Sequence, residues 1–174
     1  YGEGRPLLLL HGNTASSAMF DPVKELYIPK YQVIDMDFLG HGQSERLDQL
    51  PSDLWFAEAE QAAALIRGLH LKDVCVMGAR GGAIVAVNLL LEHPELICAV
   101  IADSFEGEFP LKEIVSGLGA DRENGKSDED TVAFWEHCHG KDWERVVDQD
   151  TDAAVRHYET IGRFYHRELT EAQK

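Results

Sequence analysis

The stretch from Val74 to Val85 constrains the fold of this chain more than any other. Its sequence, Val-Cys-Val-Met-Gly-Ala-Arg-Gly-Gly-Ala-Ile-Val, is typical of a short buried strand that turns directly into an apolar helix. Two small residues on each side of Arg80 leave room for a tight turn, and their glycines tolerate a positive φ. Such a turn presents the residue at its tip, so we expect Arg80 to be displayed where the strand ends.

Predicted strands and helices alternate over the first hundred residues. Continuous apolar runs such as Leu7–Leu10 are typical of strands that are buried on both faces. Right-handed crossovers between parallel strands place helices on both sides of the sheet. The sequence therefore predicts a doubly wound parallel α/β sheet, with strands at Pro6–Leu10, Tyr31–Asp37, Val74–Met77 and Ile97–Ala102, and helices at Ser17–Leu26, Leu54–Leu69 and Ala83–Glu92.

Within the first predicted helix, Ser17 is expected to be the N-cap. Met19, Phe20, Val23 and Leu26 are expected to face inward.

The character of the chain changes after the fourth predicted strand. Acidic residues outnumber basic ones, β-branched runs are few, and helical patterns cover Leu111–Leu118, Asp128–His137 and Asp152–His166. The stretch Gly119–Ser127 holds turn-forming residues without an apolar anchor, so we expect a mobile loop there. We expect residues 1–104 to form the α/β core and residues 105–174 a helical cap.

Composition excludes several classes of function. The net charge of −15, with Lys and Arg dispersed along the chain, argues against a nucleic-acid partner. No apolar run approaches the roughly 20 residues of a membrane-spanning helix. Cys75 and Cys98 lie in predicted strands, as expected of buried, reduced thiols in a cytoplasmic protein. We expect no signal peptide, and because the sequence starts at Tyr1 without an initiator Met, we expect a preceding segment to be missing.

Four motifs, taken together and in their order along the chain, resemble those of the α/β-hydrolase family. The first strand ends in His11-Gly12-Asn13, like the family's oxyanion loop, and Asp37-Phe38-Leu39-Gly40-His41-Gly42-Gln43-Ser44 is similar to its DxxGHGxS turn. The turn around Arg80 matches the nucleophile elbow GxSxG except that it lacks the Ser. The next helix ends in His93-Pro94-Glu95, as helices at this position of the family do.

The resemblance implies a mechanism for acyl transfer. In the family a Ser attacks an acyl carbon, a His takes its proton, an Asp or Glu orients the His, and two backbone N–H groups hold the oxyanion. By position, Asn13 would supply one of these N–H groups. Asp103 takes a position that some relatives use for the acid. We otherwise expect the acid and the His beyond Lys174, so the fold should be incomplete at both ends. The same resemblance assigns His41 and Ser44 to stabilising their loop.

Two alignments of the elbow remain open. Either Arg80 replaces the Ser, or one residue has been lost between Ala79 and Arg80, in which case the Arg80 N–H would belong to the oxyanion hole. If Arg80 replaces the Ser in an otherwise continuous chain, we expect a relaxed turn with Arg80 directed to solvent or to an acidic neighbour. Neither alignment supplies a nucleophile, so we expect this chain to be inactive as an esterase.

Other candidate sites are weaker. His137, Cys138 and His139 resemble a metal cluster, but residues i and i+2 of a helix point to different faces, so we expect no metal and no other cofactor. Glu106 and Glu108 are expected at a solvated edge. The aromatic residues of the cap either line an acyl pocket or attach the helices to the core: Phe134, Trp135, Trp143, Tyr158, Phe164 and Tyr165.

The sequence leaves two functions open. In its complete form the protein would hydrolyse a small ester or related acyl substrate through an elbow nucleophile. Alternatively, it is a non-catalytic relative whose pocket binds a ligand or partner, with the Arg80 guanidinium offered to a carboxylate.

Overall fold

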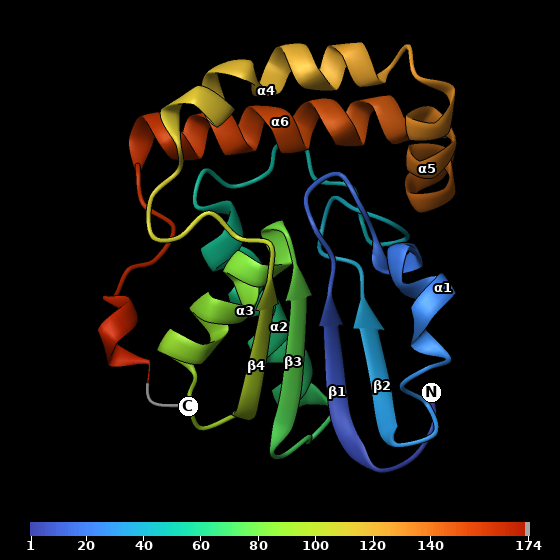
Figure 1. The fold of residues 1–174 in the computed structure, drawn as a ribbon, viewed down its shortest axis with the longest axis vertical. Coiled ribbons are helices and arrows are strands. Elements are labelled where there is room, and N and C mark those ends of the chain that lie inside the picture. Colours follow the sequence, from blue (N-terminus) through green and yellow to red (C-terminus); the bar gives the residue numbers. More distant parts are fainter. Residues whose placement is uncertain (173–174) are drawn as a thin grey trace.

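The computed structural model describes residues 1–172 of the chain, and its core is one parallel sheet. The strands are β1 (Arg5–Leu10), β2 (Tyr31–Met36), β3 (Val74–Ala79) and β4 (Ile97–Asp103). They lie in the order β2-β1-β3-β4, which confirms the predicted parallel α/β sheet (Figure 1).

Burial on both faces explains why β1 is apolar throughout. Leu8 and Leu10 pack into the core formed with α2 and α3, whereas Leu7 and Leu9 pack with Phe20 on the opposite face. All four leucines are buried. The central position of β1, between β2 and β3, therefore follows directly from its sequence.

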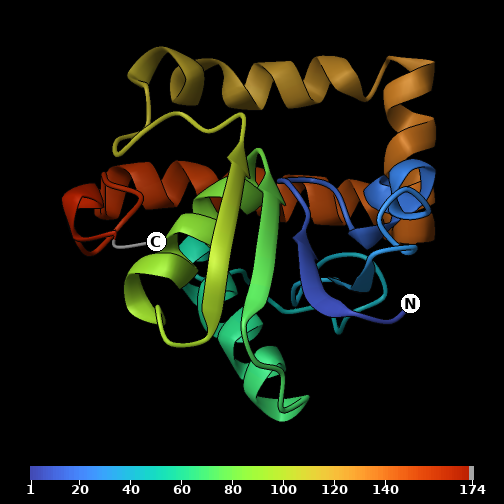
Figure 2. The same cartoon turned by 60° about the horizontal axis from the view of Figure 1, so that its bottom comes forward.

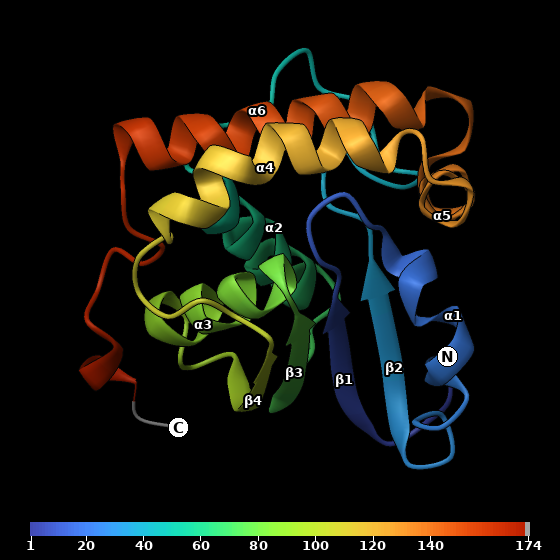
Figure 3. The ribbon, with the colours of Figure 1, turned by 45° about the horizontal axis from the view of Figure 1, so that its top comes forward.

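The two long helices of the core lie against the same face of the sheet. They are α2 (Leu54–Gly68) and α3 (Gly81–Glu92), shown together on one side in Figure 3. Within residues 1–172 no helix covers the other face of β3 and β4, which stands in front in Figure 2. Ile101 on β4 is accordingly 58% exposed. Only part of the expected second helical layer is present in the described residues.

The first predicted helix is wrong in its extent. A 3-10 turn, η1 (Ser17–Phe20), is followed by the short α1 (Asp21–Lys24), because Pro22 sits at the start of a new helix rather than inside one. Ser16, not Ser17, is the N-cap. Val23 and Leu26, which we expected to face inward, are 37% and 75% exposed.

Beyond the carboxyl ends of the strands lie three helices that we call the helical layer (Figure 1). They are α4 (Lys112–Gly125), α5 (Glu129–His139) and α6 (Trp143–Thr160), with η2 (Gly140–Asp142) between the last two and η3 (Leu169–Glu171) near the end. Asp128 caps α5 by accepting the Thr131 N–H, in keeping with the predicted start of that helix.

Two predictions for this layer are wrong. The expected loop Gly119–Ser127 is helical as far as Gly125, because α4 packs on α6 and Lys126 pairs with Asp148 at its end. Helix α6 begins at Trp143 rather than Asp152, and ends at Thr160 rather than His166. Tertiary packing overrides local turn preference in both cases.

The predicted burial of two cysteines is also wrong. Cys75 and Cys98 are free thiols that are half-buried, on the β3–β4 side of the sheet, with their sulfur atoms 3.4 Å apart.

Glycine at position 82 allows α3 to approach β1. A Cβ there would lie 2.1 Å from the Leu10 carbonyl oxygen, whereas a Cβ on Gly119 in exposed α4 would meet nothing within 4 Å. We expect Gly82→Ala to lower the free energy of unfolding by about 3 kcal/mol or more, and Gly119→Ala to raise it by about 0.5–1 kcal/mol. Urea unfolding measures both; equal effects would contradict the packing described here.

Candidate functional site

The turn between β3 and α3 keeps a strained backbone. Arg80 has φ 55° and ψ −119°, and its N–H donates to the Asp103 carbonyl oxygen at 2.8 Å. Close packing imposes this conformation, since a Cβ on Gly78 would lie 1.9 Å from the Gly82 carbonyl oxygen. The expectation of a relaxed turn is therefore wrong. Arg80 occupies the tip of the elbow, and Gly81 is the residue that follows.

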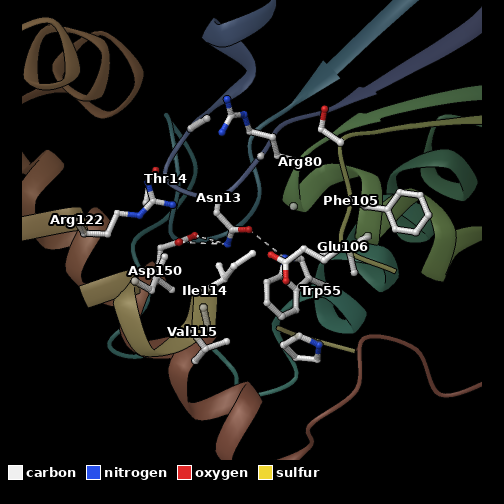
Figure 4. A pocket seen from close by; sticks show the side chains of 18 of the residues that line it. Asn13, Thr14, Trp55, Arg80, Phe105, Glu106, Ile114, Val115, Arg122 and Asp150 are labelled. Atoms are coloured by element: carbon white, nitrogen blue, oxygen red, sulfur yellow. Dashed lines mark hydrogen bonds between the residues drawn. The ribbon is translucent and has the colours of Figure 1, made fainter. Parts of the chain in front are cut away.

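The Arg80 side chain is exposed and unpaired within residues 1–172, where its guanidinium makes neither a hydrogen bond nor an ion pair. Of the two expected directions, solvent or an acidic neighbour, the structure shows the first. The side chain is exposed at the rim of the pocket described below, and in Figure 4 it extends away from Glu106.

Asn13 lies beside the elbow and is held by its side chain. Its amide Nδ2 donates to both carboxylate oxygens of Asp150, at 3.2 and 3.0 Å, and its Oδ1 accepts from the Trp55 indole at 3.2 Å. A Cβ on Gly81 would lie 3.1 Å from the Asn13 backbone nitrogen, so the two backbones approach closely. Gly81 starts α3, where N–H groups have no partner within the helix. This pair can form a cradle for an oxyanion.

Asp150, like Trp55 and Arg122, is a residue of this site that the sequence did not single out. It lies on α6 and is only 2% exposed, and besides Asn13 it accepts a hydrogen bond from His41 Nε2 at 3.0 Å. Burial opposes ionisation, but the hydrogen bonds from His41 and Asn13 prevail and lower the pKa of Asp150. The carboxylate thus joins the helical layer to two loops of the core. The acidic run around it in the sequence concealed this role.

Three buried histidines lie beneath the loops. His11 and His41 have ring centroids 5.3 Å apart, and those of His41 and His139 are 6.0 Å apart. Burial lowers the pKa of His11 to about 3 and that of His139 to about 4. His11 and His139 each bridge backbone groups. His11 accepts from the Phe38 N–H and donates to the Gly12 carbonyl, and His139 accepts from the Gly42 N–H and donates to the Thr14 carbonyl. These rings are structural parts of the site.

The glycine-rich turn after β2 is tied by Asp37. Its carboxylate accepts the backbone N–H groups of Ser17 and Gln43, each at 2.7 Å, and the Ser44 hydroxyl donates to its carbonyl oxygen. Burial would raise the pKa of Asp37, but these bonds lower it. This network holds the turn next to the Asn13 loop.

Glu58 on α2 is buried and makes no hydrogen bond among the described residues. Burial, with the nearby charge of Asp150 adding to it, raises the pKa of Glu58 well above its ordinary value. Its surroundings therefore favour the protonated form of the Glu58 carboxyl group.

A pocket of about 700 Å³ opens between the elbow and the helical layer (Figure 4). Its charged side chains are Arg80, Glu106, Arg122 and Asp150. The rest of its wall is mostly apolar and comes from both core and helical layer: Trp55, Ile84, Phe105, Ile114, Val115, Leu118, Phe134, Trp135 and Phe164. A small molecule with an apolar body and few charged groups suits such a lining.

The structure brings together only part of the predicted site. Arg80 and Asn13 line the pocket, but Asp103 does not; its carboxylate accepts from the Ser104 hydroxyl at 2.9 Å, and only its carbonyl touches the elbow. Of the six aromatic residues, Phe134, Trp135 and Phe164 line the pocket. Trp143 instead stacks on Trp135. Glu106, which we expected at a solvated edge, also lines the pocket.

His137, Cys138 and His139 follow one another on α5, and Cys138 and His139 are buried there. Over residues 1–172, no cluster of three or more His, Cys, Asp or Glu side chains is arranged to hold a metal ion. In the same range no helix combines the length and apolarity needed to cross a bilayer.

Comparison with known proteins settles the family. The model of the alpha/beta hydrolase fold matches residues 5–122, which include both loops, the elbow and the sheet. The chain belongs to the α/β-hydrolase family.

Characterised relatives are hydrolases. The chain is 32% identical over 98 residues to the (E)-2-((N-methylformamido)methylene)succinate hydrolase of Acinetobacter baylyi, a match covering 55% of this chain and 36% of the relative. It is 31% identical over 106 residues to the 2-(acetamidomethylene)succinate hydrolase of Mesorhizobium japonicum, covering 60% of this chain and 37% of the relative. The matched stretch thus spans little more than a third of either relative.

Solved structures share the fold over almost the whole chain. A crystal structure of E-2-(acetamidomethylene)succinate hydrolase aligns with a TM-score of 0.69 at 21% identity, covering 98% of this chain and 69% of that one. An esterase from Exiguobacterium antarcticum aligns with a TM-score of 0.70 at 18% identity, covering 99% and 70%.

The buried histidines make stability depend on pH. A lowered pKa in the folded state means that the unfolded chain binds more protons below about pH 6.5, so the free energy of unfolding falls as the pH falls. At pH 5, His11 and His139 each lower it by about 2 kcal/mol.

His139→Asn keeps an acceptor for the Gly42 N–H but removes one titrating group. Although this variant loses stability at pH 7, its free energy of unfolding should fall by about 1.2 kcal/mol less than that of the unsubstituted chain between pH 6 and pH 5. Urea unfolding at both values measures the slope. An unchanged slope would show that His139 is not held neutral.

Proposed function

We propose that the pocket binds a small acyl compound that carries a carboxylate, and that this chain does not turn it over. The observation that carries the proposal is Arg80. A strained elbow displays this residue at the pocket rim with a guanidinium that has no partner among the described residues. Guanidinium groups bind carboxylates through two parallel hydrogen bonds.

Arg80 also explains the expected lack of turnover. Arginine stays protonated in proteins and has no lone pair to attack an acyl carbon. In subtilisin, which uses a Ser nucleophile, removing that Ser lowers kcat by about 10⁶-fold. An elbow built around Arg80 can therefore retain binding while losing the chemistry.

A second candidate is hydrolysis of a small ester or related acyl compound by the complete protein. Family membership and hydrolase relatives favour it, as does the close approach of Asn13 and Gly81. Under this proposal Asn13 supplies one oxyanion N–H, Asp103 is a candidate acid, and residues 105–174 form a cap over a core of residues 1–104. We also propose a cytoplasmic location, in keeping with three free cysteines.

Calorimetric titration tests the primary proposal. N-acetyl-L-glutamine carries one carboxylate, and its methyl ester carries none. We expect the acid to bind the protein at least about tenfold more tightly than the ester, because a charge-assisted pair with Arg80 is lost in the ester. Arg80→Gln should abolish this difference, whereas Arg67→Gln, which removes an exposed partner of Glu95, should leave it intact.

Hydrolysis of p-nitrophenyl acetate separates the two candidates. We expect the rate with the protein to equal the rate in buffer alone. Turnover above the buffer rate would overturn the non-catalytic proposal in favour of the second candidate. Equal binding of the acid and its methyl ester would remove Arg80 from ligand recognition.

A further inference from the structure

The arginines of this chain differ in their partners according to where they lie. Six arginines outside the pocket donate to carboxylates or backbone carbonyls: Arg46, Arg67, Arg145, Arg156, Arg163 and Arg167. The two that line the pocket, Arg80 and Arg122, donate to nothing within residues 1–172. Within the described residues, the exposed Arg5 is the one other arginine without a hydrogen bond or an ion pair. The chain has 31 acidic residues, yet two guanidinium groups in one pocket are left unpaired by them, so these groups are available to bind an anionic ligand.

Arg122 is the more constrained of the two. It lies on α4, and its Nε is buried without a hydrogen-bond partner. Arg122 stabilises the buried carboxylate of Asp150 through space, but it makes no ion pair with that carboxylate. The oxygens of Asp150 are already used by Asn13 and His41. A buried N–H without an acceptor costs free energy until a partner reaches it.

The positions of the charges give the pocket a polarity. In Figure 4 Asn13 lies between Asp150 on one side and Glu106 with Trp55 on the other. Arg122 lies on the Asp150 side, and the Arg80 side chain extends away from Glu106. Negative groups of a ligand are therefore drawn towards the two arginines and repelled from Glu106, while the negative charge of Asp150 is compensated by its hydrogen bonds with Asn13 and His41.

We propose that Arg122 binds a second carboxylate, so that the pocket selects acyl compounds with two carboxylates. This inference rests on the proposed function, in which Arg80 binds the first. Arg80 comes from the elbow and Arg122 from the helical layer, so a ligand that bridges them spans the pocket. The apolar side chains of Ile84, Ile114 and Val115 remain for its acyl body.

Affinity for matched ligands tests the inference. N-acetyl-L-glutamate differs from N-acetyl-L-glutamine only in having a second carboxylate in place of the amide. By calorimetry the intact chain should bind the glutamate compound at least about tenfold more tightly than the glutamine compound. Arg122→Gln should bring this ratio close to one, and Arg122→Lys should retain part of it. Arg67→Gln should leave the ratio unchanged.

Failure of the inference is distinguishable from failure of the proposed function. If N-acetyl-L-glutamine binds no better than its methyl ester, the proposed function fails. If it does bind better, but a second carboxylate adds nothing or the ratio survives in Arg122→Gln, the role of Arg122 alone is overturned. Tighter binding of N-acetyl-O-phospho-L-serine than of the glutamate compound would assign the site to phosphate instead.

Thermal unfolding of the free protein provides a structural control. Arg122 makes no hydrogen bond or ion pair within residues 1–172 and acts on Asp150 only through space, so Arg122→Gln should lower the unfolding temperature by no more than about 2 °C. A larger fall in unfolding temperature, together with equal loss of affinity for both ligands, would make Arg122 a structural residue and overturn the inference.

Discussion

The buried carboxylate of Asp150 holds the two halves of this molecule together. It receives hydrogen bonds from Asn13 and His41, which belong to two separate loops of the core, while its own backbone belongs to α6. A buried charge is tolerated only when it is fully paired, so this arrangement fixes the loops and the helix relative to one another. The shape of the pocket, which has walls from both halves, depends on these bonds.

Hydrogen bonding distinguishes the side chains that support the site from those that we propose to bind the ligand. Asn13, His11, His139 and Asp37 have their polar atoms engaged with the protein itself. Arg80 and Arg122 do not. The hydrogen-bonded side chains hold the loops rigid, whereas the two guanidinium groups keep free hydrogen-bond donors for a ligand. Because the loops are already ordered, binding costs less conformational entropy.

Local sequence predicted the parallel sheet and the positions of its strands, because runs such as Leu7–Leu10 and the small residues around Arg80 carry their own structural signal. It could not predict where α6 begins, since Trp143 and Val147 lie in an otherwise acidic stretch and are buried by packing with Trp135 and Val132 of the preceding helix. Nor could it find Asp150, whose partners lie more than a hundred residues away. It placed Arg80 at the elbow correctly but expected the turn to relax.

The turn at Arg80 keeps its strained backbone without a Ser because its conformation does not depend on the side chain at that position. The elbow is shaped by Gly78 and Gly82 and by the packing of α3 on β1 and β3, and none of these contacts involves the side chain at position 80. Every residue other than glycine meets a similar steric penalty at this φ, whatever its chemistry. The residue at position 80 can therefore be substituted during evolution, with gain or loss of reactivity, while the fold of the turn around it is kept.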